Sequence, residues 1–248
     1  MPNTKMTRDR MKNHFQYGKM IYIAIIIVTV MLADILYTAT VYKAPSDRRI
    51  DIYLVSHNSD ITEAAPYEQV ALDAAHAFER ERDAANGIDV NSESYKPQIE
   101  EVNFVSLIYD LYSEDGAYSQ ERFMLTLSTH EGDIYMVSRD VLEYFVQEGL
   151  VTDLTSYIES GVINPGERNL LKVTYPEFVA KGQPATGNMC IYALQIDTLG
   201  GLWDAFAFNY SLDMYMVLMD YSENKDVSAA VMQSMIDQFE VSAQTAAE

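Results

Sequence analysis

Polar side chains that could hold a small ligand follow two predicted strands of this 248-residue chain. The β-rich run 50–55 is followed by Ser-His-Asn-Ser-Asp, and the run 133–138 ends in Ser and is followed by Arg-Asp. In an open α/β sheet, ligands bind beyond the carboxyl ends of the strands. Asn, Asp and Arg supply fixed donors and acceptors there, and the single Trp can stack on a sugar ring. The candidate ligand-binding residues are His57, Asn58, Asp60, Ser138, Arg139, Asp140 and Trp203.

Each candidate residue also has a structural interpretation. Asp60 can cap the turn after the first strand, and Asp140 can cap the helix that follows the strand at 133–138. Arg139 can pair with a surface carboxylate, and Trp203 can lie in the core. The sequence leaves both interpretations open for every one of these residues.

The spacing patterns of common catalytic and metal sites are absent from the sequence. It contains no Gly-x-Ser-x-Gly nucleophile elbow, no His-Glu-x-x-His zinc helix and no glycine-rich phosphate loop. Its four histidines are scattered, and segment 110–116 has the glycine of a calcium loop without the ligand spacing. Cys190 has no second cysteine to pair with, and its apolar surroundings predict a buried, inert thiol. We therefore expect no enzyme activity, no metal and no cofactor.

Charge divides the chain into a basic N-terminal segment and an acidic remainder. Residues 41–248 hold 12 basic and 35 acidic side chains, a formal charge of −23. Such a surface repels nucleic acid and anionic lipid, so we expect no nucleic-acid partner. A chain of about 200 residues can bury one good core, or two small lobes, without disulfides.

One long apolar segment, residues 20–42, predicts a transmembrane helix. Its 23 residues cover roughly 34 Å at about 1.5 Å per residue, which is enough to cross a bilayer. The alternative is a cleaved signal peptide, which needs a small residue three positions before the cut. A cut after Ala33 places Met31 there, and a cut after Ala39 places Tyr37 there. The sequence therefore favours an uncleaved anchor.

The charges around this segment predict its orientation. Five basic residues lie in segment 1–19, and the positive-inside rule makes that segment cytoplasmic. The rest of the chain is then extracellular, held at the cell membrane by a single pass. Asp34 lies in the last third of the span, where it either reaches the outer interface or meets a polar residue of a partner helix.

Beyond a linker at 43–49, predicted strands alternate with predicted helices. The extended segments are 50–55, 101–108, 133–138, 188–196 and 214–219. The helical segments begin near 62, 118, 140, 150 and 229. This alternation predicts a parallel sheet covered on both faces. Segment 161–187, rich in Pro and Gly, has no clear assignment, and 241–248 is expected to be a disordered tail.

Several phrases in this region resemble the first lobe of bacterial extracellular solute-binding proteins of the sugar ABC-importer type. Residues 118–127 resemble the helix before the third strand, and residues 131–137 resemble the Gly-x-Pro-Asp-Ile phrase that opens it. Residues 148–158 resemble the Gly-Leu-Leu-x-Asp-Leu-Thr phrase that follows. Weaker similarities lie at 187–194 and 221–230.

The resemblance spans residues 49–239 and implies an α/β fold. After the transmembrane helix, it implies a three-layer αβα periplasmic-binding-protein-like lobe with a mainly parallel sheet over residues 50–240. Such proteins normally have two lobes, and they either carry a lipid on a cysteine or have no anchor. In this chain a segment long enough for one lobe follows an apolar helix. The implied role is an accessory or sensor of a carbohydrate transport system, with an ABC permease as partner and a small sugar as ligand. The alternative is an interaction module that binds membrane proteins and no solute.

Overall fold

The chain forms two units in a computed structural model, with the boundary after Lys43. The structure describes residues 8–40, 43–56, 61–109, 116–166, 170–174, 189–197, 199–206 and 213–245. His57, Asn58 and Asp60 lie outside these residues.

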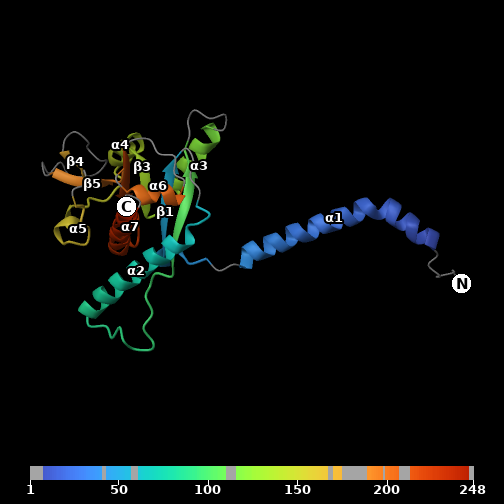
Figure 1. The fold of residues 1–248 in the computed structure, drawn as a ribbon, viewed down its shortest axis with the longest axis horizontal. Helices are drawn as coiled ribbons and strands as arrows, with labels where there is room; N and C mark the ends of the chain where they lie inside the picture. Colours follow the sequence, from blue (N-terminus) through green and yellow to red (C-terminus); the bar gives the residue numbers. More distant parts are fainter. Residues whose placement is uncertain are drawn as a thin grey trace. The chain divides into compact units, whose positions relative to one another are not determined.

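The first unit contains one long helix, α1 (Arg8–Thr40) (Figure 1). Its side chains are described at Lys19 and at 21–36, and all of them are exposed. Among the described residues, no helix reaches the length and mean hydropathy that a membrane crossing requires. The helical conformation expected for segment 20–42 is present as far as Thr40.

The second unit is built on a mixed β-sheet. Its described residues form six strands in the order β2-β1-β3-β6-β5-β4. These strands are β1 (Arg49–Ser56), β2 (Glu101–Ile108), β3 (Ile134–Ser138), β4 (Leu170–Thr174), β5 (Met189–Gln195) and β6 (Met214–Leu218). β1 runs parallel to β2 and β3, whereas β6, β5 and β4 each run antiparallel to the strand before them in this order. The expected parallel sheet is thus confirmed for β1, β2 and β3 and does not extend further.

The sequence of each strand matches its position in the sheet. In β1 every residue after Arg49 is buried, and all five residues of β6 are buried. β6 is apolar throughout, and the buried part of β1 is apolar except for Asp51 and Ser56. Buried, mostly apolar runs of this kind are typical of strands covered on both faces. β2 alternates between buried and partly exposed positions over much of its length, as suits a strand at the edge of the sheet.

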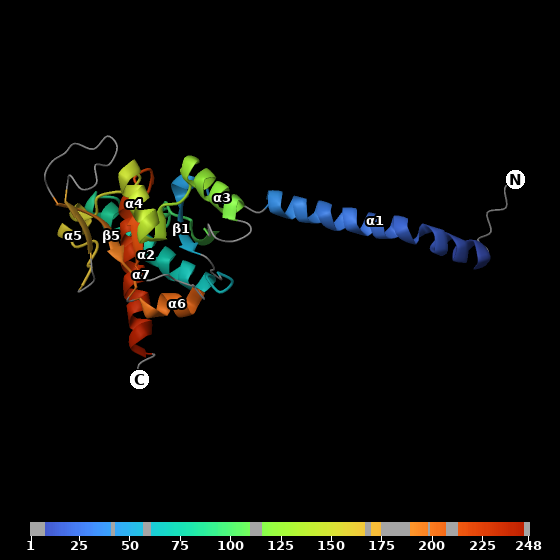
Figure 2. The same ribbon diagram turned by 90° about the horizontal axis from the view of Figure 1, so that it is seen from above.

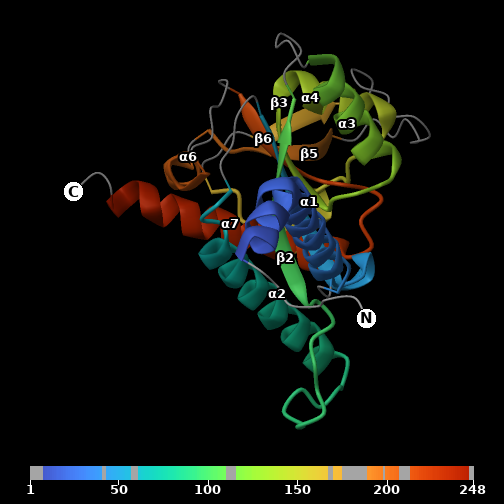
Figure 3. The same ribbon diagram turned by 90° about the vertical axis from the view of Figure 1, so that its right-hand side faces the viewer.

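Helices cover both faces of the sheet (Figures 2 and 3). On one face lie α2 (Ala65–Ala85), α6 (Gly200–Phe206) and α7 (Lys225–Thr245), and on the other lie α3 (Gly116–Ser128) and α4 (Arg139–Glu148). Alternate side chains of β1 enter the two cores: Ile52 and Leu54 pack on the first face, Tyr53 and Val55 on the second. The domain therefore has a sheet between two helical layers.

The ends of the predicted helices agree with their sequence signals. Pro66 lies in the first turn of α2, where its missing N–H costs nothing, and the helix ends at Asn86. Gly149 closes α4 with a left-handed backbone (φ 69°), and its N–H caps the last turn. The short helix α5 (Thr155–Glu159) follows within the segment where we expected helix.

Four features differ from the sequence-based expectations. β4 lies in segment 161–187, which had no assignment, and α6 forms where no helix was expected. The tail was expected to be disordered from 241, yet α7 continues to Thr245. Within the expected linker, the short turn η1 (Ser46–Arg48) forms and Ala44 is already buried.

Candidate functional site

The strand order places the carboxyl ends of β1 and β3 side by side. From β1 the chain passes to β2 on one side and then crosses to β3 on the other, so a topological switch point lies between β1 and β3. The two strands are in register at Leu54 and Met136, and two residues further on they end in Ser56 and Ser138. Open α/β sheets bind ligands at such a point.

Ser56 ends β1 with an unsatisfied hydroxyl group. The residue is 9% exposed, and its Oγ has no hydrogen-bond partner in the described part of the chain. Its carbonyl oxygen accepts a hydrogen bond from the N–H of Tyr109, the residue after β2 (3.0 Å). A buried hydroxyl without a partner costs about 1–3 kcal/mol. A polar ligand at the switch point would remove this cost.

The segment Ser138, Arg139 and Asp140 lies at the end of β3, as predicted. Ser138 is the N-cap of α4 and makes no side-chain capping bond, so its hydroxyl is not used by the helix. Arg139 Nε donates to Glu143 Oε1 (3.2 Å), and this hydrogen bond raises the pKa of the guanidinium. Asp140 is exposed in the first turn of α4, where the helix dipole favours a carboxylate. The structural interpretation of Arg139, a pair with a surface carboxylate, therefore has direct support. Asp140 is not the cap of α4, because Ser138 occupies that position.

The prediction for Trp203 stays untested. Its backbone belongs to α6, and its side chain lies outside the described residues. The structure thus brings together Ser138, Arg139 and Asp140, next to Ser56, and leaves the remaining candidates undescribed.

Two carboxylates that the sequence analysis missed lie at the same edge of the sheet. Asp197, which follows β5, accepts hydrogen bonds from the N–H groups of Asp213 (3.0 Å) and Met214 (2.7 Å). Gln195 Nε2 donates to both Asp197 (2.7 Å) and Asp213 (3.2 Å). Asp213 has a positive φ of 75°, which residues other than glycine rarely adopt, and its carbonyl accepts from the N–H of Arg139. These contacts fix the start of β6 beside the predicted site.

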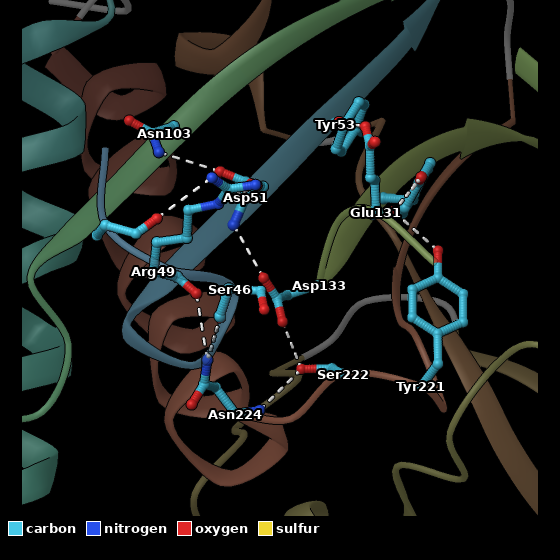
Figure 4. Close-up of polar contacts among 12 residues, drawn as sticks. Ser46, Arg49, Asp51, Tyr53, Asn103, Glu131, Asp133, Tyr221, Ser222 and Asn224 are labelled. Atoms are coloured by element: carbon cyan, nitrogen blue, oxygen red, sulfur yellow. Dashed lines mark hydrogen bonds and ion pairs between the residues drawn. The ribbon is translucent and has the colours of Figure 1, made fainter. Parts of the chain in front are cut away.

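A second polar site lies at the opposite edge of the sheet, where β1 and β3 begin (Figure 4). Asp133 precedes β3 and accepts hydrogen bonds from the N–H of Asp51 at Oδ2 (2.9 Å) and from Ser222 Oγ at Oδ1 (2.6 Å). Burial raises the pKa of Asp133 to about 6, although both hydrogen bonds oppose the shift. Ser222 Oγ in turn accepts from the N–H of Asn224 (3.2 Å). The carboxyl group is therefore held on both oxygens.

The same network holds the start of β1. Asn224 Nδ2 donates to the carbonyl oxygens of Ser46 and Arg49, at 3.2 Å each. Arg49 Nε pairs with Asp51 Oδ2 (2.9 Å), and Asn103 Nδ2 donates to Asp51 Oδ1 (3.0 Å). Segments from both ends of the domain meet here, which identifies the network as a structural clamp.

A loop bound by tyrosines lies next to this clamp (Figure 4). The hydroxyls of Tyr135 (2.7 Å) and Tyr221 (2.9 Å) donate to the carbonyl oxygen of Glu131, and that of Tyr53 donates to its Oε2 (3.3 Å). Burial raises the pKa of all three phenols, so they remain donors at neutral pH. Gly132 follows with a positive φ of 87° and lies against the stacked rings of Tyr53 and Tyr135.

A cavity of about 300 Å³ lies between the clamp and this loop. Its lining includes Arg49, Asp51, His130, Glu131 and Asp133. Nothing in the spacing of these residues along the sequence predicted that they would meet. In the described residues, no group of three or more His, Cys, Asp and Glu side chains is arranged to hold a metal ion.

Comparison with protein-family models gives no match, and comparison with curated proteins gives no relative.

Proposed function

We propose that this chain is a membrane-anchored, extracytoplasmic solute-binding-like protein, an accessory or sensor of a transport system for carbohydrate. The observation that carries the proposal is the switch point between β1 and β3. There, the buried hydroxyl of Ser56, which has no partner among the described residues, lies beside the strand end that bears Ser138 and Arg139. Hydroxyl and guanidinium groups at such a point are suited to hydrogen bonding with a sugar.

The architecture of the domain supports the lobe-like part of the proposal. The second unit has a single sheet with helices on both faces, as the resemblance to the first lobe of solute-binding proteins implies. A single lobe offers a ligand one face of contacts in place of a closed cleft. Weak, readily reversible binding is the expected result, and it suits a sensor better than a carrier.

The apolar surface of α1 supports the membrane anchor. Most described side chains of 21–36 are large, apolar and exposed, and Ile21, Ile26 and Leu36 are each more than 60% exposed. A lipid environment removes this surface from water, at about 25 cal/mol per Å². After alkaline extraction of membranes, we expect the full-length chain in the pellet and a variant lacking 20–42 in the supernatant. Recovery of the full-length chain in the supernatant would contradict the anchor.

The test of the binding function is a melting experiment with sugars. The full-length chain, held in a detergent without a sugar head group, is screened against mono- and oligosaccharides. A ligand that binds the folded state raises the melting temperature in proportion to RT ln(1 + [L]/Kd), about 2.7 kcal/mol at 100 times the Kd. We expect Arg139→Met to lose the shift and Arg80→Met, on the exposed surface of α2, to keep it. Absence of any shift in the wild-type chain would refute solute binding.

An interaction module is the second candidate, and one observation favours it. Tyr118 and Leu125 on α3 are 69% and 61% exposed, and Ile108 at the end of β2 is 47% exposed. Tyr118 and Leu125 are seven residues apart and share a helix face. Exposed apolar surface of this kind is typical of protein contacts. Co-purification of a permease that Leu125→Ser abolishes, without any sugar-dependent melting shift, would favour this candidate over the first.

A further inference from the structure

One buried carboxyl group is the centre of the clamp at the start of β1 (Figure 4). Asp133 is 9% exposed, and its Oδ2 accepts a hydrogen bond from the N–H of Asp51 (2.9 Å). Its Oδ1 accepts from the hydroxyl of Ser222 (2.6 Å), whose Oγ accepts from the N–H of Asn224 (3.2 Å). Because both carboxyl oxygens are acceptors, these contacts depend on where a proton on Asp133 would lie.

The other end of the clamp holds the first residues of the second unit. Asn224 Nδ2 donates to the carbonyl oxygens of Ser46 and Arg49, at 3.2 Å each. These two residues bound segment 46–49, which lies just beyond the boundary between the two units. A chain of contacts therefore connects the carboxyl group of Asp133 to segment 46–49.

The geometry lets Asp133 take up a proton without losing any of these contacts. The N–H of Asp51 can only donate, so Oδ2 has to remain an acceptor and the proton has to lie on Oδ1. There it is donated to Ser222 Oγ, which has a second lone pair for the N–H of Asn224. The hydrogen of the Ser222 hydroxyl then turns toward the cavity of about 300 Å³ that Ser222 lines, where water can accept it. The clamp is thus complete when Asp133 is neutral.

The ionised form of Asp133 is the costly one. Burial raises the pKa of this carboxyl group to about 6, and the carboxylate of Asp51 adds to the shift, whereas both hydrogen bonds and Arg49 oppose it. The other titratable groups that face Asp133 line the same cavity, and they are His130 and Glu131 before β3 and Tyr221 and Glu223 before α7. When the clamp opens, water solvates the carboxylate and its pKa returns to about 3.9. The closed form therefore binds more protons between about pH 4 and 6, and a rise in pH through this range favours opening.

We propose that Asp133, Ser222 and Asn224 form a proton-controlled latch on segment 46–49, which is closed in acid and opens more often at neutral pH. The opening is local, because Gln98 and Glu100 hold the segment from another side and keep it in place when Asn224 separates from it. Local openings of this kind need less free energy than unfolding of the whole domain. This inference is independent of the proposed sugar site.

Amide hydrogen exchange of the full-length chain in detergent tests the latch, read by mass spectrometry on peptides that contain Asp51 or Asn224. After correction for the intrinsic rate, protection of these two amides should fall roughly 25-fold from about pH 4.5 to about pH 7.5, given pKa values of about 6 and 3.9. At each pH they should exchange faster than the amides of β6. Asp133→Asn carries a donor toward Ser222 as the protonated acid does, so the change with pH should disappear. Glu223→Gln is the matched control, since Glu223 is exposed in the same cavity and its loss should leave the pH dependence in place.

A second variant keeps the test decisive if Asp133→Asn does not fold. Arg49 lowers the pKa of Asp133, so Arg49→Gln should move the midpoint of the pH dependence upward. The proposal is overturned if the wild-type amides of Asp51 and Asn224 keep the same protection at both pH values, or if they exchange no faster than those of β6, which would make the opening global. It is also overturned if Asp133→Asn retains the wild-type pH dependence, or if Arg49→Gln leaves the midpoint unchanged.

Discussion

The substitution Gly132→Ala tests how tightly the tyrosine-bound loop is packed. A Cβ atom at Gly132 would lie 2.5 Å from Tyr53 Cδ2 and 2.7 Å from Tyr135 Cε2. Neither ring can withdraw easily, because the rings stack at 4.9 Å and the Tyr135 hydroxyl is bonded to the Glu131 carbonyl. The left-handed backbone costs an alanine about 1–2 kcal/mol, and overpacking adds about 1–3 kcal/mol. The expected loss of stability is about 2–5 kcal/mol.

Thermal unfolding followed by circular dichroism measures this loss, with Gly87→Ala as the control. Gly87 has a similar φ of 82°, but nothing lies within 4 Å of the added Cβ, so only the backbone cost applies. At about 2–4 °C per kcal/mol for a domain of this size, the melting temperature should fall by about 2–8 °C in Gly87→Ala and by about 4–20 °C in Gly132→Ala. Equal losses in the two variants would refute the steric argument.

Three further predictions concern the buried polar groups. Burial raises the folded-state pKa of Asp133 to about 6, above an unfolded value of about 3.9. The folded state therefore binds more protons between about pH 4 and 6, and the free energy of unfolding falls by up to about 3 kcal/mol as pH rises through this range. In urea denaturation Asp133→Asn should lose this part of the slope, and an unchanged slope would contradict the assignment. Ser222→Ala leaves Asp133 Oδ1 without its donor and the N–H of Asn224 without its acceptor. It should cost about 1–3 kcal/mol in the same assay, whereas Ser228→Ala should cost little, because that buried hydroxyl has no partner in the described part of the chain. Burial raises the pKa of Asp153, but hydrogen bonds from side-chain and backbone donors lower it further than burial raises it. Asp153→Asn should therefore destabilise the chain by about 1–2 kcal/mol at pH 7. The difference should shrink as the pH falls through the lowered pKa of the wild-type carboxylate.

The first half of the domain was predictable because its signals are local. β1 contains the apolar run 52–55, α2 has a proline in its first turn, and α4 ends at Gly149. The alternation of such elements also predicted the parallel pairing of the first three strands and the position of Ser138 and Arg139 at a strand end. The second half depends on antiparallel pairing between distant segments, which local patterns do not specify.

The clamp at the opposite edge shows what the sequence could not reveal. Asp51, Asp133 and Ser222 are polar residues at unremarkable positions, and they meet only because the strand order brings their segments together. Glu79 likewise has the spacing of an ordinary helix residue, and its burial follows from the segment that carries Ile99. Local charge density gave no indication of either group, because acidic residues are frequent all along residues 41–248.

The position of β6 between β3 and β5 has a consequence for the chain during its synthesis. A chain that emerges from its N-terminus completes β1, β2 and β3 early, but one edge of β3 stays unpaired until Leu218 has emerged. An apolar strand with an open edge is a template for wrong pairing with other chains. Chains cut short before β6 should therefore aggregate more readily than chains that lack only the end of α7, and the growing chain needs shielding until its last strand arrives.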